Sequence, residues 1–225
     1  ILHFHEFYLL PLAKHVKYYY DTKTIYDVHE DLRFVGETFS RRNQLLRSLS
    51  IFIKTHKERY YIKFIDQVVL INPIIKDCIF VDWGLSPVIL EGYPSYLSIS
   101  DNLNNGCRGN TIIYHGHLGP ERGIQELVES VIIIKKKFPN VLLILLGTFR
   151  YEEFEKYILN IINENELSNN IKWIKQVPHK EVWSYLNKAS IGLIPFKNNA
   201  ITLNNTPTKL FEMMASGCGI IATDL

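Results

Sequence analysis

Short apolar runs, many of them β-branched, alternate with longer stretches of helical periodicity along almost the whole chain. The apolar runs predict strands that are buried on both faces, which is typical of parallel sheets covered by helices. Each crossover between parallel strands is then expected to be right-handed, as in Rossmann-like α/β domains. Predicted strands cover residues 1–5, 24–28, 67–71, 87–90, 111–115, 141–146, 171–174, 191–195 and 219–222, and predicted helices cover 9–20, 41–65, 123–138, 152–164, 180–188 and 207–216.

A segment without periodicity, residues 98–110, is rich in Ser, Asn, Asp and Gly and predicts a linker. The chain is therefore predicted to divide into a partial N-terminal domain, 1–97, and a second domain, 111–225. The sequence starts at Ile1 rather than Met and stops directly after a strand-like run. We expect a piece of a longer protein, with both domains truncated. Ligands of such sheets bind at the carboxyl ends of the strands.

Composition narrows the class of protein only a little. A net charge of +2 over 225 residues gives no argument for binding nucleic acid. The three cysteines match neither a zinc-site spacing nor a disulfide framework, so a cytoplasmic protein is expected. No apolar run approaches the ~18 residues that would span a bilayer, and no signal peptide is evident.

The segment YHGHLGPERGIQELVES (114–130) ends a strand and begins a helix near Gly123. Its glycines, Gly116 among them, allow the backbone to approach a ligand, and the helix start offers free N–H groups to an anion. Arg122 could add a bidentate grip on phosphate. The alternative is an ordinary turn with a solvated arginine, and the segment alone does not decide between the two.

The segment TPTKLFEMMASGCGIIATDL (206–225) predicts a helix with Thr206 as N-cap and Pro207 in the first position. Lys209 falls in the first turn, where its charge opposes the helix dipole unless an anion lies nearby. Glu212 lies on the same helix face, three residues later. The pair is either a surface Lys–Glu pair or a diphosphate site in which Glu212 accepts hydrogen bonds from a sugar diol; the placement of Lys209 favours the second.

Two strand ends in the first half carry a histidine followed by an acidic residue, His5-Glu6 and His29-Glu30. Strand ends are where α/β proteins place their chemistry. His3, His5 and His29 raise the question of a metal site, but spacing alone supplies no geometry, and we predict none.

Together these segments resemble the GT-B glycosyltransferases, most closely the retaining family 4 group of bacterial capsule, exopolysaccharide and lipopolysaccharide biosynthesis. The resemblance covers nearly the whole chain and is densest over 111–225. It rests on HFHEFYLLPLA (3–13), YDVHE (26–30), YHGHLGPERGIQELVE (114–129), FPNVLLILLG (138–147), VPHKEVWSYLNKASIGLIPF (177–196) and PTKLFEMMASG (207–217).

The resemblance implies roles for individual residues. Arg122 and Lys209 would contact the donor phosphates, Glu212 the ribose hydroxyls, and His29 would be the active-site histidine. His117 stands where many members have a second arginine, and Asn204 where many have a glutamate facing the donor sugar. The predicted donor-binding set is Gly116, Arg122, Val177, Pro178, Thr208, Lys209, Leu210 and Glu212.

The resemblance also implies the reaction. A sugar would pass from a UDP- or GDP-sugar to a glycan or lipid-linked acceptor with retention of configuration. Departure of the diphosphate develops negative charge, which preorganised cations and helix N–H groups stabilise. No Asp-x-Asp motif occurs, so we expect neither a metal nor a cofactor.

Three other classes of protein share part of this sequence pattern. A GT-B sugar-nucleotide epimerase shares the donor site, and a non-catalytic nucleotide-binding fragment remains open. A Rossmann dehydrogenase is rejected because GHLGPERG (116–123) has the wrong glycine spacing.

The predicted helix Ser40–Ile65 is rich in basic and aromatic residues, which fits either contact with the inner face of the cell membrane or a solvated helix whose aromatics belong to the core.

Overall fold

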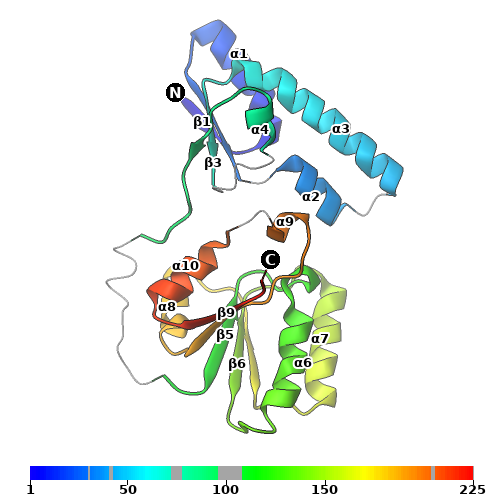
Figure 1. The fold of residues 1–225 in the computed structure, drawn as a ribbon, viewed down its shortest axis with the longest axis vertical. Helices are drawn as coiled ribbons and strands as arrows, with labels where there is room; N and C mark the ends of the chain where they lie inside the picture. The colour runs from blue at the N-terminus through cyan, green and yellow to red at the C-terminus, as the bar shows by residue number, and fades with distance from the viewer. Residues whose placement is uncertain (30, 41–42, 72–77, 96–107, 204–205, 225) are drawn as a thin grey trace. The chain divides into compact units, whose positions relative to one another are not determined.

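The structure is a computed structural model of the chain and describes every residue except 30, 41–42, 72–77, 96–107, 204–205 and 225 (Figure 1). The chain forms two compact units. The first comprises Ile1–Gly92 and Asn199–Thr206, and the second comprises Tyr93–Asn198 and Pro207–Leu225. The predicted domain boundaries at residues 97 and 111 stay a prediction, since most of the predicted linker lies outside the described residues.

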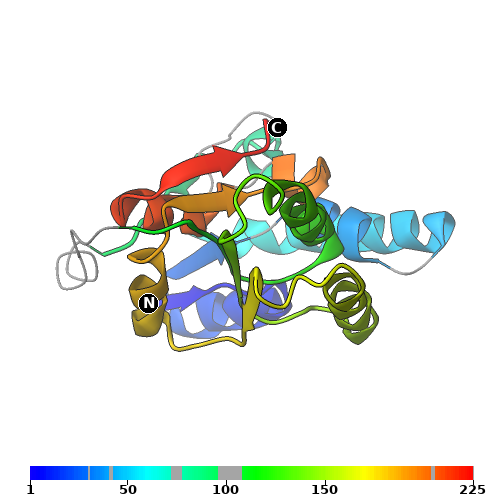
Figure 2. The same cartoon turned by 90° about the horizontal axis from the view of Figure 1, so that it is seen from below.

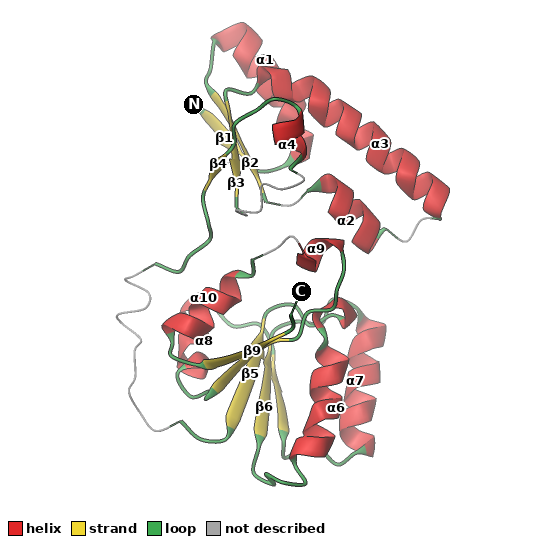
Figure 3. Cartoon of the chain, in the orientation of Figure 1, coloured by secondary structure: helices red, strands yellow, loops and turns green. Residues whose placement is uncertain are grey.

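The first unit is built on a four-stranded sheet in the order β1-β2-β3-β4, and every neighbouring pair is parallel (Figure 3). Helix α3 contacts both α1 and α2, and α9 contacts α2. The strands are β1 (Leu2–Phe4), β2 (Thr24–Val28), β3 (Gln67–Leu70) and β4 (Val88–Ile89); the helices are α1 (Leu10–Tyr20), α2 (Leu32–Phe39), α3 (Gln44–Tyr61), α4 (Ile79–Asp82) and α9 (Ala200–Leu203), with short 3-10 turns at Phe7–Leu9 and Ile62–Phe64.

The core of the first unit lies on the face of the sheet that carries the even-numbered side chains of β1 and β2. Phe4 and Tyr26 are buried there and stack with ring centroids 5.2 Å apart. The Tyr26 hydroxyl donates a 2.9 Å hydrogen bond to the buried carboxyl of Glu58 on α3. Burial raises the pKa of Glu58 to about 7. The odd-numbered side chains of these strands therefore occupy the opposite face.

The second unit is a five-stranded parallel sheet in the order β7-β6-β5-β8-β9. Helices α6 and α7 cover one face, and α8 and α10 cover the other (Figures 1 and 2). The strands are β5 (Thr111–His115), β6 (Leu142–Leu146), β7 (Ile171–Ile174), β8 (Ile191–Ile194) and β9 (Gly219–Ala222); the helices are α6 (Ile124–Ile134), α7 (Glu152–Glu164), α8 (His179–Leu186) and α10 (Thr208–Ala215), with a 3-10 turn at Pro120–Arg122.

These two parallel sheets confirm the predicted α/β class. All nine predicted strands are present, and no strand end differs from its predicted position by more than one residue. The predicted cap of the last helix is wrong. Pro207, in an extended conformation, occupies the N-cap position without a side-chain hydrogen bond, and Thr208 is the first helical residue. Helices α2, α4 and α9 were not predicted.

Within the described part of the chain, no helix is both long enough and apolar enough to span a bilayer.

Candidate functional site

The carboxyl ends of β5 and β6 come together through two glycines. Gly116 follows β5 with φ +112°, and Gly147 follows β6 with φ +150°. The Gly116 amide donates to the Leu146 carbonyl at 2.9 Å. A Cβ added to Gly147 would overlap the backbone oxygen of Gly116. The loop after β5 thus lies so close to β6 that only glycine fits at this contact.

Lys209, in the first turn of α10, lies directly over this loop. Its ammonium donates a 3.0 Å hydrogen bond to the Tyr114 hydroxyl and lies 4.3 Å from the centre of that ring. A Cβ on Gly116 would approach the Lys209 Nζ to 2.5 Å. Burial, followed by repulsion from Arg122, lowers the pKa of Lys209 to about 7. The side chain is held partly dehydrated in the first turn of a helix, where its positive charge is disfavoured unless an anion lies nearby.

Arg122 is not a solvated side chain of an ordinary turn. Its guanidinium packs over the Phe196 ring at 4.5 Å, and its side chain is only 13% exposed. The carboxylate of Glu121 lies between two cations, with its Oε1 3.6 Å from Arg122 Nε and 3.5 Å from Arg150 Nη1. Arg122, Arg150 and Lys209 outnumber the two carboxylates at this end of the sheet, Glu121 and Glu212.

Glu212 points into the same end of the second unit and is buried, with 6% exposure. His179, the first residue of α8, lies with its Nε2 2.6 Å from Glu212 Oε1. His115 Nε2 lies 3.4 Å from the other carboxylate oxygen. Burial lowers the pKa of His115 to about 3, so this imidazole is neutral near pH 7. Within the described residues Lys209 and Glu212 form no ion pair, so the surface-pair interpretation is wrong.

A cavity of about 230 Å³ opens at the strand ends, and of the side chains just described only those of His115 and His179 line it. Gly116 and Val177, both predicted donor-binding residues, line it. Pro178 is the N-cap of α8, Thr208 is exposed at the start of α10, and Leu210 packs on the hydrophobic core. The cavity is lined by His115, Gly116, His117, Leu146, Gly147, Thr148, Gln176, Val177, His179 and Val182.

Sequence reasoning missed several side chains of this site. Tyr114 and His115 end a predicted strand, and His179 directly precedes the helix predicted at 180–188, so the positions of these residues at element ends were a signal that their residue types were not. Gly147 follows β6 as Gly116 follows β5, and this repetition was visible in the sequence. Asn204 lies outside the described residues.

The remaining predicted site residue belongs to the first unit. His29 follows β2, its side chain is 54% exposed, and its Nε2 lies 3.7 Å from Asp27 Oδ1. Its ring meets that of His5 edge to face, with centroids 4.6 Å apart. The position at the carboxyl end of a parallel strand is the one predicted for it; a catalytic role stays a prediction.

The second unit is thus a parallel α/β unit with a glycine-lined cavity at its strand ends and with Lys209 over the glycine loop beside it, features that favour the binding of an anion. The profile of the family described as "Glycosyl transferases group 1" matches residues 99–225. The chain therefore belongs to the glycosyl transferases of group 1. No curated protein matches the chain significantly in sequence.

Solved structures of glycosyltransferases share the fold. A mutant of S. aureus TarM in complex with fondaparinux, alpha-GlcNAc-glycerol and UDP has a TM-score of 0.64 at 12% identity, covering 89% of this chain and 37% of that one. Sucrose-phosphate synthase from Thermosynechococcus elongatus has a TM-score of 0.64 at 16% identity, covering 98% of this chain and 55% of that one. HepE from Anabaena in complex with UDP and glucose has a TM-score of 0.67 at 16% identity, covering 96% of this chain and 57% of that one. The chain thus spans between 37% and 57% of the length of these GT-B proteins.

Proposed function

We propose that the protein transfers a sugar from a nucleotide-sugar donor, a UDP- or GDP-sugar, to a glycan or lipid-linked acceptor. The observation that carries this proposal is the part-buried Lys209 ammonium over Gly116, beside the cavity at the strand ends. A diphosphate would bring negative charge to the dehydrated lysine and to the helix N-terminus, and the glycine loop would let the backbone N–H groups approach it. The solved HepE and TarM structures contain UDP, which agrees with this assignment.

The roles of the individual residues follow from their positions. Lys209 and Arg122 would hold the two phosphates, with the backbone of Gly116 beside them. Glu212, fixed by His179, would accept hydrogen bonds from the ribose hydroxyls. The backbone at Val177 and Pro178 would flank the base, and Thr208 and Leu210 would place the start of α10 against the phosphates.

The chemistry of transfer uses the same charges. As the glycosyl–phosphate bond breaks, negative charge grows on the departing diphosphate, and Lys209 and Arg122 are already in place to stabilise it. We therefore propose that donor activation needs no metal or cofactor. Retention of configuration, membership of the family 4 group and a place in cell-surface polysaccharide synthesis are part of the same proposal, supported by the motifs at 26–30 and 207–217.

A lipid-linked acceptor would suit the surface of the first unit. Between the start of α1 and helix α3 lies an apolar groove of about 450 Å³ that includes Leu46, Leu49 and Ile53, with Lys54 and Lys57 at its side. Phe52 and Tyr60 on α3 are 58% and 48% exposed, so in this chain they are not core residues. Apolar side chains mixed with lysines favour contact with an anionic membrane surface. Arg41 and Arg42, which are basic residues of the predicted helix Ser40–Ile65, lie outside the described residues.

A thermal-shift screen tests the proposed function. UDP- and GDP-sugars at millimolar concentration are expected to raise the melting temperature of the second unit, whereas adenine nucleosides without a diphosphate are not. A turnover assay of the intact protein with donor alone separates transfer from epimerisation, since an epimerase needs no acceptor. Stabilisation by no nucleotide diphosphate would contradict the proposal.

Donor binding should depend on pH through Lys209. In the free protein its pKa is lowered to about 7, and a bound diphosphate returns the pKa toward the ordinary value for a lysine. The complex therefore binds more protons than the free protein, and affinity falls as pH rises above about 7. Calorimetry at pH 8 in two buffers of different ionisation enthalpy should show proton uptake on UDP binding. The uptake should disappear in Lys209→Met; uptake that persists in this variant would assign the proton to another group.

Replacement of His29 should affect transfer more than donor binding. In the intact enzyme His29→Ala is expected to lower kcat about 100-fold or more, the range of a lost acid–base or charge-stabilising group, with the donor Kd unchanged. His15→Ala, an exposed histidine on α1, serves as the control and should retain full turnover. A kcat of the wild-type size for His29→Ala would remove His29 from the active site.

A further inference from the structure

A second group of polar side chains lies on the sheet of the first unit, on the face opposite its core. β1 and β2 are parallel with Phe4 beside Tyr26, so the next position along brings His5 beside Asp27. Phe4 and Tyr26 point into the core, and the alternation of a strand therefore places His3, His5 and Asp27 together on the other face. Two strands separated in sequence thus converge on one set of nitrogen and oxygen atoms.

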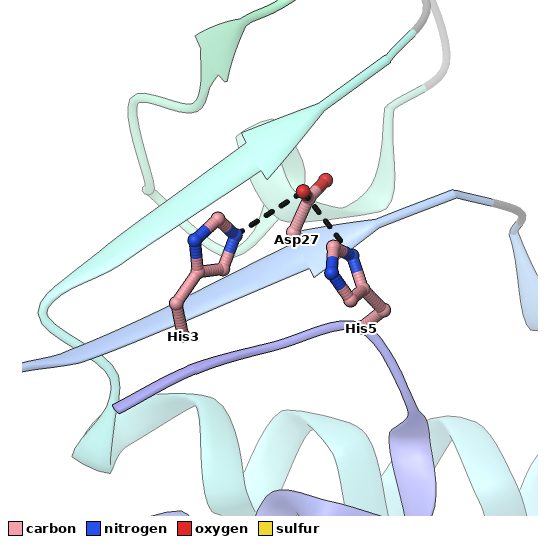
Figure 4. Close-up of side chains that lie close together, drawn as sticks. All are labelled: His3, His5 and Asp27. Carbon is pink, nitrogen blue, oxygen red and sulfur yellow. Dashed lines mark hydrogen bonds and ion pairs between the residues drawn. The ribbon is translucent and has the colours of Figure 1, made fainter. Parts of the chain in front are cut away.

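The three side chains point toward one another (Figure 4). His3 Nε2 and His5 Nδ1 each lie 3.2 Å from the same oxygen, Asp27 Oδ2. One ligand atom from each residue falls within 4.8 Å of the others. The imidazoles are about half exposed, at 48% and 52%, while the aspartate is only 16% exposed. The group is therefore anchored by the aspartate and open to solvent on the histidine side.

We propose that His3, His5 and Asp27 bind a divalent transition-metal ion of the Zn²⁺ class. Neutral imidazoles and a carboxylate are the ligands that Zn²⁺ takes in proteins. With metal–ligand bonds of about 2.0–2.2 Å, neighbouring ligand atoms of a tetrahedral site lie about 3.3–3.6 Å apart, close to the 3.2 Å found here. A small rotation of the exposed imidazoles closes the site around an ion.

The second carboxylate oxygen of Asp27 lies near a third histidine, His29, which is not one of the proposed ligands. Asp27 Oδ1 lies 3.7 Å from His29 Nε2, and the His29 ring also meets the ring of His5, with centroids 4.6 Å apart. Contacts of this kind fix the orientation of a metal-binding carboxylate. Three protein ligands leave a coordination position for water or another ligand, as in catalytic rather than structural zinc sites. This ion would belong to the first unit and would have no part in holding the donor diphosphate, so the inference does not rest on the proposed function.

Metal titration of the chain, prepared without a polyhistidine tag and stripped with a chelator, tests the site. Zn²⁺ is expected to bind with one ion per chain in calorimetry. Co²⁺ should give the visible absorption of a four- or five-coordinate site, which octahedral Co²⁺ in water lacks. Loss of a group that only orients a ligand costs about 10- to 100-fold in metal affinity, so His3→Ala, His5→Ala and Asp27→Asn should each cost at least ~100-fold.

His15→Ala is the matched control, because it removes an exposed histidine of the same unit outside the cluster, and its Zn²⁺ affinity should equal that of the wild type. If a ligand variant fails to fold, Zn²⁺ protection of His3 and His5 against diethyl pyrocarbonate in the wild-type chain, located by mass spectrometry, decides the question. Absence of Zn²⁺ and Co²⁺ binding, or binding that the three ligand variants leave unchanged, would overturn the proposal and leave a hydrogen-bonded histidine–aspartate cluster.

Discussion

Lys209→Ala and Glu212→Ala are each expected to weaken UDP binding about 10- to 100-fold, because each removes charge-assisted hydrogen bonds to the nucleotide. Lys209 is held over Gly116 by its hydrogen bond to Tyr114, and no other described side chain of α10 reaches that point. Glu212 is buried and fixed by His179, so its carboxylate is oriented before the nucleotide arrives. Calorimetric titration of UDP into the purified variants measures both effects.

The controls for this pair come from the same unit. Lys156 and Glu152 on α7 form an exposed ion pair of 2.7 Å, with side chains 73% and 79% exposed. Their replacement by alanine makes the same changes of charge away from the cavity and should leave UDP affinity unchanged. Circular dichroism must show that the Glu212 variant is folded, since its side chain is buried. Wild-type affinity in either Lys209→Ala or Glu212→Ala would remove the donor site from this end of the sheet.

The strands could be predicted because buried parallel strands are nearly continuous apolar runs, and this signal depends on no distant residue. Helix α2 was missed for the opposite reason. Its segment contains Gly36 and β-branched residues, which lower helix propensity. Its stability comes from packing on α3: a Cβ on Gly36 would come within 2.7 Å of Ile51. Close packing of two helices is a tertiary effect, and the glycine that permits it argues locally against a helix.

The site was predictable as a set of strand and helix ends but not as a set of contacts. Lys209 and Tyr114 are separated by 95 residues, and Glu212 and His179 by 33. Helical spacing correctly placed Lys209 and Glu212 one turn apart, but it suggested that the two side chains face each other. In the structure Lys209 contacts Tyr114 of β5, and Glu212 contacts His179 of α8. Which elements lie beside α10 depends on the order of the strands in the sheet.

Gly147→Ala is expected to be the most destabilising single methyl addition at the site. Its φ of +150° belongs to a region that is essentially restricted to glycine, and the new Cβ would overlap the Gly116 carbonyl oxygen. Neither peptide can easily move away, because the Gly116 amide donates to Leu146 and the Gly147 amide donates to Ile174. Backbone strain and overpacking together should cost about 3–5 kcal/mol of unfolding free energy, a large part of the stability of a domain.

Urea unfolding followed by tryptophan fluorescence measures this loss, since the indole N–H of Trp173 donates to the Gly147 carbonyl at 2.9 Å and therefore senses the altered segment. Gly109→Ala is the matched control: nothing lies within 4 Å of its added Cβ, and its φ is not in the positive region. That variant should unfold at the wild-type urea concentration. Because Gly147→Ala also displaces the loop beneath Lys209, whatever remains folded should bind UDP more weakly. An unchanged unfolding midpoint for Gly147→Ala would mean that Gly116, after β5, does not lie against Gly147, after β6, and the cavity that these two glycines line would have to be abandoned.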